Sequence, residues 1–180
     1  QFVYTVGNSL EAIRLRVEQG SSDYAADGIP PAAYADVASK FGVNKGRFFV
    51  RPLLSVQYLA MNTAQHAFKN NVQLRRAVNY AIDRTAMLRQ SGFLAGKRAD
   101  QILPPGLTGF RDANLYPLKG PDLTTAKKFA NGHTGDGKLV VYTCNSGSCP
   151  LRAQILQYNL KQIGLDVEVK QFTRAVQIQK

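Results

Sequence analysis

A strand-like segment followed by two helical segments, near the middle of the chain, constrains the fold most. Residues 56–61 are mostly apolar and end at Asn62, and a polar stretch separates them from residues 71–82. Apolar residues in that second segment recur three or four positions apart, which is typical of an amphipathic helix. Asp83 is suited to capping a further helix through Leu88, because its carboxylate can accept from the free backbone amides of a first turn. The sequence therefore predicts a strand, a short loop and two consecutive helices.

Helix and strand patterns alternate along the rest of the chain, which predicts an α/β layer fold. Asn8, with Glu11 three residues later, is suited to capping the first helix, and Gly20 to ending it. Glycine and proline recur from residue 92 to 121, which predicts a long irregular loop. Strands are expected at residues 2–6, 48–50, 56–61, 138–143 and 165–172, and helices near residues 31–41, 71–82, 83–88, 122–129 and 150–163. Val72, Val78 and Ile82 are expected on the apolar face of the central helix.

The chain is strongly basic for its size. Its 180 residues include 23 Lys and Arg against 12 Asp and Glu, which gives a net charge of +11. A module that binds nucleic acid or cell-wall polyanions needs these charges on one continuous face. The basic residues are instead scattered, with adjacent pairs such as Arg75-Arg76 and Lys127-Lys128. A polyanion- or nucleic-acid-binding module is therefore the alternative to the interpretation below.

Several motifs, in this order, resemble family 5 of the extracellular solute-binding proteins, the receptors of ABC importers for peptides and similar solutes. Each motif alone is weak, but together they cover nearly the whole chain. The resemblance implies a periplasmic-binding-protein-like lobe of type II, cluster C, with a mixed sheet flanked by helices. The residues that carry it are Asn62-Thr63, Leu74-Arg75-Arg76-Ala77, Tyr80-Ala81-Ile82-Asp83-Arg84, Leu103-Pro104-Pro105-Gly106, and segments 122–129 and 154–169.

Members of that family have two lobes and are about two to three times longer. The resemblance therefore implies that residues 1–180 form a single lobe, the C-terminal ligand-binding one, excised and truncated at its C-terminus. It implies capture of a peptide or small solute in an interlobe cleft by hinge closure. The implied partners are the missing N-terminal lobe and the permease subunits, with no nucleic acid. The implied location is extracytoplasmic, in the periplasm or as an envelope lipoprotein whose lipid anchor is its only membrane contact.

The two cysteines, Cys144 and Cys149, lie between a predicted strand end and a predicted helix start. A redox pair is more typically Cys-x-x-Cys, and a zinc site needs two further ligands, for which His66 and His133 lack the usual spacing. Free thiols are a third possibility. A local disulfide suits the extracytoplasmic location that the resemblance implies, and it is our prediction.

The loop between these cysteines is the best candidate for ligand binding. Ligands of open α/β sheets gather at the carboxyl ends of strands and at helix N-termini, where backbone amides point outward. In peptide-binding relatives the equivalent loop lines the cleft, although a plain polar turn is the simpler alternative. Asn62, at the end of another predicted strand, is a weaker candidate. The predicted ligand-binding residues are Asn62, Thr143, Asn145, Ser146, Gly147 and Ser148.

No catalytic pattern is visible in the sequence. It contains no Gly-x-Ser-x-Gly motif, and the glycines before Lys97 and Lys138 do not have phosphate-loop spacing. Its acidic residues are few and do not suggest a two-carboxylate glycosidase site. We therefore expect a binding protein without enzymatic activity, cofactor or metal.

Overall fold

A computed structural model describes residues 1–179 as two compact units. The smaller unit comprises Gln1–Arg51 with Ser91–Ala95, and the larger one Pro52–Gln90 with Gly96–Lys180. The prediction that the chain forms one lobe of a two-lobed protein stays a prediction. The two units are described separately below.

The smaller unit holds two α-helices, α1 (Leu10–Glu18) and α2 (Tyr34–Phe41), the latter preceded by a short 3-10 turn, η1 (Pro31–Ala33). A charged side chain joins the helices, because Glu18 of α1 accepts from Lys40 of α2 at 2.9 Å. Glu18 also accepts from Arg14 of its own helix at 2.6 Å. Both cations lower the pKa of the Glu18 carboxyl, with the Lys40 hydrogen bond as the largest cause. Ser9, rather than the predicted Asn8, caps α1 by accepting from the Ala12 amide.

Two of the predicted strands fall in the smaller unit, and neither prediction was correct. Residues 2–6 carry no strand pairing and are largely exposed, with Phe2 90% accessible. Residues 48–50 contribute only isolated bridges from Phe48 to Val43 and Lys45. Both segments have suitable residue types, but a strand forms only where a neighbouring backbone completes its hydrogen bonds.

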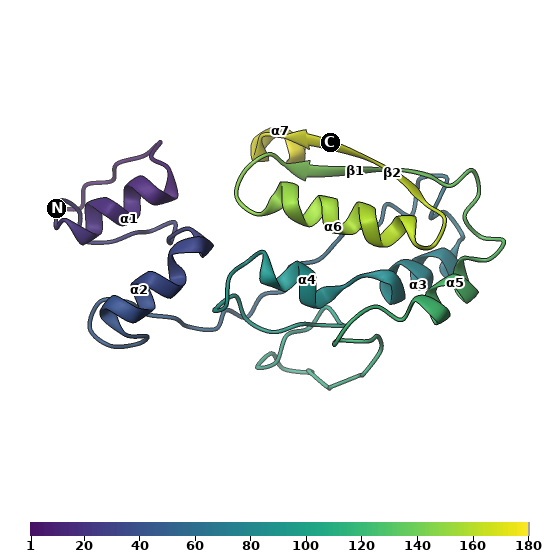
Figure 1. Cartoon of the computed structure of the whole chain (residues 1–180), viewed down its shortest axis with the longest axis horizontal. Coiled ribbons are helices and arrows are strands. Elements are labelled where there is room, and N and C mark those ends of the chain that lie inside the picture. The colour runs from purple at the N-terminus through teal and green to yellow at the C-terminus, as the bar shows by residue number, and fades with distance from the viewer. Residues whose placement is uncertain (180) are drawn as a thin grey trace. The chain divides into compact units, whose positions relative to one another are not determined.

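The larger unit is an α/β structure, as predicted, built on a parallel strand pair (Figure 1). Strand β1 (Lys138–Cys144) pairs with β2 (Asp166–Phe172), and α6 (Cys149–Lys161) connects them and packs against both. A helical crossover is the usual connection between parallel strands. Burial alternates along most of both strands, with Val167 buried between exposed Asp166 and Glu168. One sheet face therefore belongs to the core. The short helix α7 (Arg174–Ile178) follows β2.

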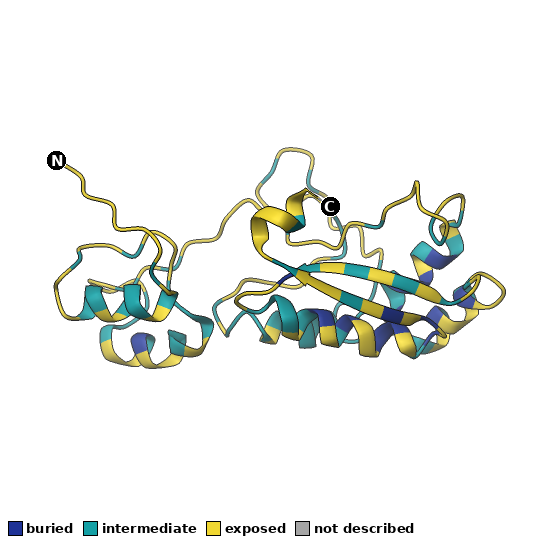
Figure 2. Ribbon diagram, turned by 90° about the horizontal axis from the view of Figure 1, so that it is seen from above, coloured by how far each residue is buried: buried dark blue, intermediate teal, exposed yellow. Residues whose placement is uncertain are grey.

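Three further helices complete the larger unit: α3 (Val72–Ala81), α4 (Arg84–Arg89) and α5 (Leu123–Ala130). Helix α3 packs against α5 and α6, and α4 packs against α6. In Figure 2, buried residues alternate with exposed ones along the helices of the larger unit, among them α3 and α5, whereas α4 has only half-buried and exposed residues. The buried core consists of Leu74, Ala77, Val78, Ala81, Ala126, Ala130, Leu156, Leu160, Ile163, Leu165 and Val167.

The helix boundaries agree with the sequence better than the strands do. Asp83 and Asp122 cap α4 and α5 by accepting from the Ala86 and Thr125 amides, each at 2.9 Å, as predicted. The apolar face of α3 was predicted only in part. Val78 is buried and Ile82 half-buried, but Val72 is 48% exposed and Leu74 takes the innermost position.

Residues 56–61 do not form the predicted strand, and the sheet of the described chain contains only β1 and β2. The segment runs without a ladder partner, and its Gln57 side chain accepts from Arg152 of α6 at 2.7 Å. Met61 packs on the core, whereas Tyr58 is 71% exposed. The apolar pattern of this segment therefore reflects partial contact with the core rather than sheet pairing.

The long loop predicted at residues 92–121 is present, and Arg84 contacts it near Ala99 and again at Tyr116. The Arg84 guanidinium donates to the Ala99 carbonyl at 3.0 Å and to the Asn79 carbonyl at 2.8 Å, and it lies 5.7 Å from the centre of the Tyr116 ring. Burial lowers the pKa of Arg84, against an opposing effect of Asp100. Asp100 in turn accepts from the Tyr116 backbone amide.

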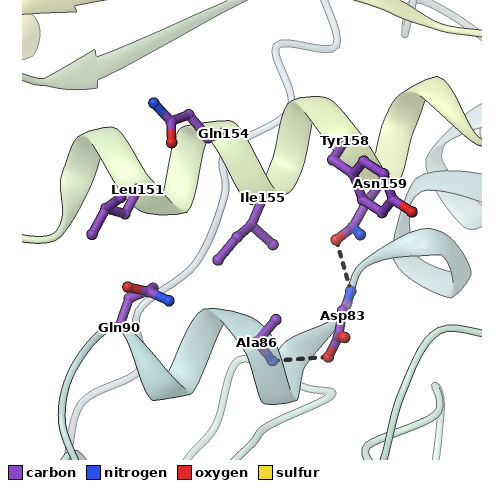
Figure 3. A pocket seen from close by; sticks show the side chains of 8 residues that line it. All are labelled: Asp83, Ala86, Gln90, Leu151, Gln154, Ile155, Tyr158 and Asn159. Atoms are coloured by element: carbon purple, nitrogen blue, oxygen red, sulfur yellow. Dashed lines mark hydrogen bonds between the residues drawn. The ribbon is translucent and has the colours of Figure 1, made fainter.

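Asn159 connects α6 to the break between α3 and α4 (Figure 3). It is 5% exposed, and its Oδ1 accepts from the Asp83 backbone amide at 2.9 Å. This amide precedes α4 and lies in a partly buried region, so it depends on the Asn159 side chain for a partner. A buried amide without an acceptor costs free energy that an apolar replacement does not recover.

We expect Asn159→Leu to lower the free energy of unfolding by about 1–3 kcal/mol, because it leaves the Asp83 amide without its acceptor. The measurement is urea unfolding followed by circular dichroism. Gln154→Leu, at an exposed position of the same helix, is the matched control and should change stability by less than about 0.5 kcal/mol. Equal effects of the two substitutions would contradict the proposed role of Asn159.

Candidate functional site

The predicted loop lies where the sheet ends and α6 begins. The Asn145 amide donates to the Phe172 carbonyl at 2.8 Å, which extends the contact between the strands by one residue. The Cys149 amide donates to the Ser146 carbonyl at 3.3 Å and closes the turn. Between these points Gly147 has a φ of +58°, a left-handed conformation that disfavours side chains. The backbone of the loop is thus held at both ends.

Polar groups of this loop face solvent. Asn145, Ser146 and Gly147 are exposed, and Ser148 is half-buried. Ser148 occupies the N-cap position of α6, but within the described residues its side chain makes no capping hydrogen bond. An N-terminal turn carries backbone amides without intrahelical acceptors and a partial positive charge. The loop therefore offers two hydroxyl groups, an amide side chain and a helix N-terminus to a polar ligand.

The two cysteines lie at either end of this loop. Their sulfur atoms are at bonding distance, and their Cα atoms are 5.4 Å apart, which is a normal separation for a disulfide. Cys144 is buried at the end of β1, whereas Cys149 is half-buried at the start of α6. A covalent link here spans the strand end and the helix start and limits the freedom of the loop.

The other two predicted site residues have different environments. Thr143 is half-buried in β1, opposite Gln171 of β2, so it adjoins the loop through the strand. Asn62 is exposed, and its side chain accepts from the Ala64 amide at 3.0 Å. The Asn62 side chain thus stabilises a local turn, and among the described residues no hydrogen bond of that side chain reaches the loop. Its predicted ligand role stays a prediction.

Arg152 is a charged residue near the loop that was not predicted as part of the site. It lies in the first turn of α6, and its amide donates to the Ser148 carbonyl at 3.0 Å. Its guanidinium donates to Gln57 at 2.7 Å, and burial lowers its pKa. A guanidinium within one turn of the helix N-terminus adds to the positive potential there. In the sequence, a basic residue three positions after Cys149 could have indicated that Arg152 belongs to the site.

A pocket of about 340 Å³ lies between α4 and α6 (Figure 3). Leu151, Ile155 and Tyr158 line it from α6. Ala86 of α4 and Gln90, directly after that helix, line its other side. None of the predicted site residues lines this pocket. Its apolar residues recur at positions 151, 155 and 158, on a different side of α6 from the core residues 153, 156 and 160. This second apolar stripe was visible in the sequence as a helical repeat.

The described residues contain no group of three or more His, Cys, Asp or Glu side chains placed to hold a metal ion. Among the helices at residues 1–179, none combines the length and apolar character needed to cross a bilayer.

Known proteins resemble this chain over most or all of its length. The model of the family described as "Bacterial extracellular solute-binding proteins, family 5 Middle" matches residues 1–180. The probable di/tripeptide-binding protein 5 of Pseudomonas aeruginosa is 30% identical over 125 residues, which cover 66% of this chain and 23% of that protein. Heme-binding protein A of Haemophilus influenzae is 29% identical over 136 residues, or 73% of this chain and 25% of the relative.

The fold is also found among solved structures. The clavulanic acid biosynthesis oligopeptide binding protein 2 superposes with a TM-score of 0.76 and 24% identity, over 96% of this chain and 32% of that structure. At this identity the likeness concerns the fold alone. The chain therefore spans about a quarter of the length of the two curated relatives and a third of this structure.

Reduction should destabilise the larger unit if Cys144 and Cys149 are bonded. Closing a loop this short stabilises the folded state by about 2 kcal/mol through the entropy of the unfolded chain. The measurement is denaturant unfolding with and without dithiothreitol. The double variant Cys144→Ala/Cys149→Ala should match the reduced protein and be insensitive to the reductant. An unfolding midpoint of the original chain that does not change on reduction would contradict the bond.

Proposed function

This chain belongs to the bacterial extracellular solute-binding proteins of family 5, and from this membership we propose that it forms part of the solute receptor of an ABC importer. Peptide is the proposed ligand class, because the name of one relative specifies di- and tripeptides. The second relative is named for heme, so peptide recognition has to rest on the loop as well. The chain matches only part of each relative, so the proposed receptor includes a second lobe that these residues do not supply.

The single observation that carries this function is the polar loop held between β1 and α6. Asn145 can both donate and accept, as the backbone of a bound peptide requires, and Ser146 and Ser148 add hydroxyl groups. The helix N-terminus and the nearby guanidinium of Arg152 favour a carboxylate of the ligand. Because the loop is fixed at both ends, little conformational entropy is lost when a ligand binds.

The proposed mechanism is ligand trapping by hinge closure. A ligand that contacts both lobes binds the closed form more tightly and so shifts the population toward it. The permease of the importer then recognises the closed receptor. In this scheme the protein changes no covalent bond of its ligand, and it acts as a binding protein rather than as an enzyme.

The proposed location is outside the cytoplasmic membrane, in agreement with the description of the family as extracellular. Oxidising compartments allow disulfides to persist, and the positions of Cys144 and Cys149 fit a bond formed there. A lipid anchor on the complete receptor is part of the proposal. Such an anchor keeps a receptor close to its permease in envelopes that lack a closed periplasm.

We expect Asn145→Ala in the complete receptor to weaken peptide binding by about three- to tenfold, because it removes a side chain that hydrogen-bonds the ligand. Isothermal titration with the peptides that the receptor retains is the measurement. Lys138→Ala, at the opposite end of β1, is the matched control and should bind normally. If the affinity is unchanged in Asn145→Ala and also in Ser146→Ala/Ser148→Ala, the loop is not part of the ligand site.

Polyanion binding is a second candidate function, favoured by the net charge of +11. A protein that binds polyanions in this way releases counterions from them, so its affinity falls steeply as the salt concentration rises. Such a protein binds unrelated polyanions with similar affinity. We expect the chain instead to leave heparin at moderate salt, as a basic surface without a defined site does. The measurement is elution from heparin and from a simple cation exchanger. Much later elution from heparin than from the exchanger would favour the second function.

A further inference from the structure

The two histidines of the chain meet in one pocket of the larger unit. His66 lies in the polar stretch before α3, and His133 follows α5, so they are far apart in the sequence. Both line a pocket of about 250 Å³, together with Asn71, Thr134 and the glycines Gly132 and Gly135. Both histidines are exposed, so small solutes can reach them. Sequence spacing alone did not suggest this pairing.

Asn71 holds the two loops together. Its side-chain nitrogen donates to the His133 carbonyl at 2.8 Å and to the Ala67 carbonyl at 3.1 Å. Its side-chain oxygen accepts from the Leu74 amide at 3.0 Å and caps α3. The cap of a core helix therefore also fixes the backbone next to each histidine.

The imidazole of His66 lies beside the loop that carries His133. A Cβ atom added at Gly135 would lie 3.8 Å from Cε1 of His66, which is ordinary van der Waals contact. The turn of this loop is fixed by its own backbone, since the His133 amide donates to the Ala130 carbonyl at 2.9 Å. His66 and His133 thus line one small pocket, whose backbone these hydrogen bonds hold in place.

We propose that His66 and His133 together bind one divalent transition-metal ion. Imidazole nitrogens suit Cu²⁺, Ni²⁺ and Zn²⁺, and affinity in such a site is highest for Cu²⁺. Neither Asp nor Glu lines the pocket, so Ca²⁺ and Mg²⁺, which prefer oxygen ligands, are disfavoured. A closed structural zinc site needs four protein ligands. The two histidines supply only two, so water molecules complete the coordination in this proposal. The site uses no residue of the candidate peptide loop, so it does not depend on the proposed function.

The test is titration of the 180-residue chain with Cu²⁺, followed by calorimetry and electron paramagnetic resonance. These are the only histidines in its sequence, so an imidazole signal can be assigned to them. We expect one ion per chain with two imidazole nitrogens on the same copper. His66→Gln and His133→Gln should each remove the two-nitrogen signal and weaken binding at least tenfold. Lys69→Gln, in the loop of His66, is the matched control and should bind as the original chain does.

Circular dichroism of each variant establishes that loss of binding is not loss of folding. Two equivalent ions per chain, each removed by one variant, would show that the histidines act independently and would overturn the proposal. So would loss of binding in one variant but not in the other. Binding of inorganic phosphate without binding of Cu²⁺, Ni²⁺ or Zn²⁺ would assign the pocket to anions instead. Mg²⁺ should give no heat in the same titration.

Discussion

The attachment of α6 to the core is the constraint on which the rest of the larger unit depends. This helix connects β1 to β2, so its position sets the register and spacing of the only strand pair in the described chain. Leu156 and Leu160 bury its apolar side, and Asn159 satisfies the Asp83 amide where α3 gives way to α4. Apolar packing supplies most of the stabilisation, whereas the Asn159 bond selects one rotation of the helix, because only one rotation places that side chain beside the amide. The start of α6, and with it the loop from Asn145 to Ser148, is positioned as a result.

In the proposed ligand site, one side is the fixed loop of this chain and the other side is a second lobe that moves. The loop is fixed by the sheet on one side and by α6 on the other, so this part of the site needs little rearrangement when a ligand arrives. In the proposed mechanism the movement comes from closure of a second lobe, which these residues do not include. In this proposal, peptide recognition combines a preformed hydrogen-bonding surface with a hinge, and selectivity depends on contacts contributed by both lobes.

The sequence predicted helices, caps and the loop more reliably than strands, and the reason is physical. Asp83 and Asp122 could be identified as caps because capping depends on residues three positions apart. Residues 2–6 and 56–61 have strand-like composition, but pairing depends on a partner that the local sequence does not specify. The position of the candidate loop could be predicted because a strand end and a helix start are both local signals.

The histidine pocket was missed because Asn71 brings its two loops together through the fold. The second apolar stripe on α6 was a local indication of the α4–α6 pocket. The opposite wall of that pocket could not be predicted, because it depends on how α4 packs.

The central claim is that the loop from Asn145 to Ser148 serves a receptor for peptides. The most direct test is mass spectrometry of small molecules released by denaturing the complete receptor after purification from its native host. Short peptides, present near one per protein molecule and depleted in the Asn145→Ala receptor, are the predicted result. Recovery of a sugar, a metal chelate or heme in their place, at a similar ratio, would contradict the claim.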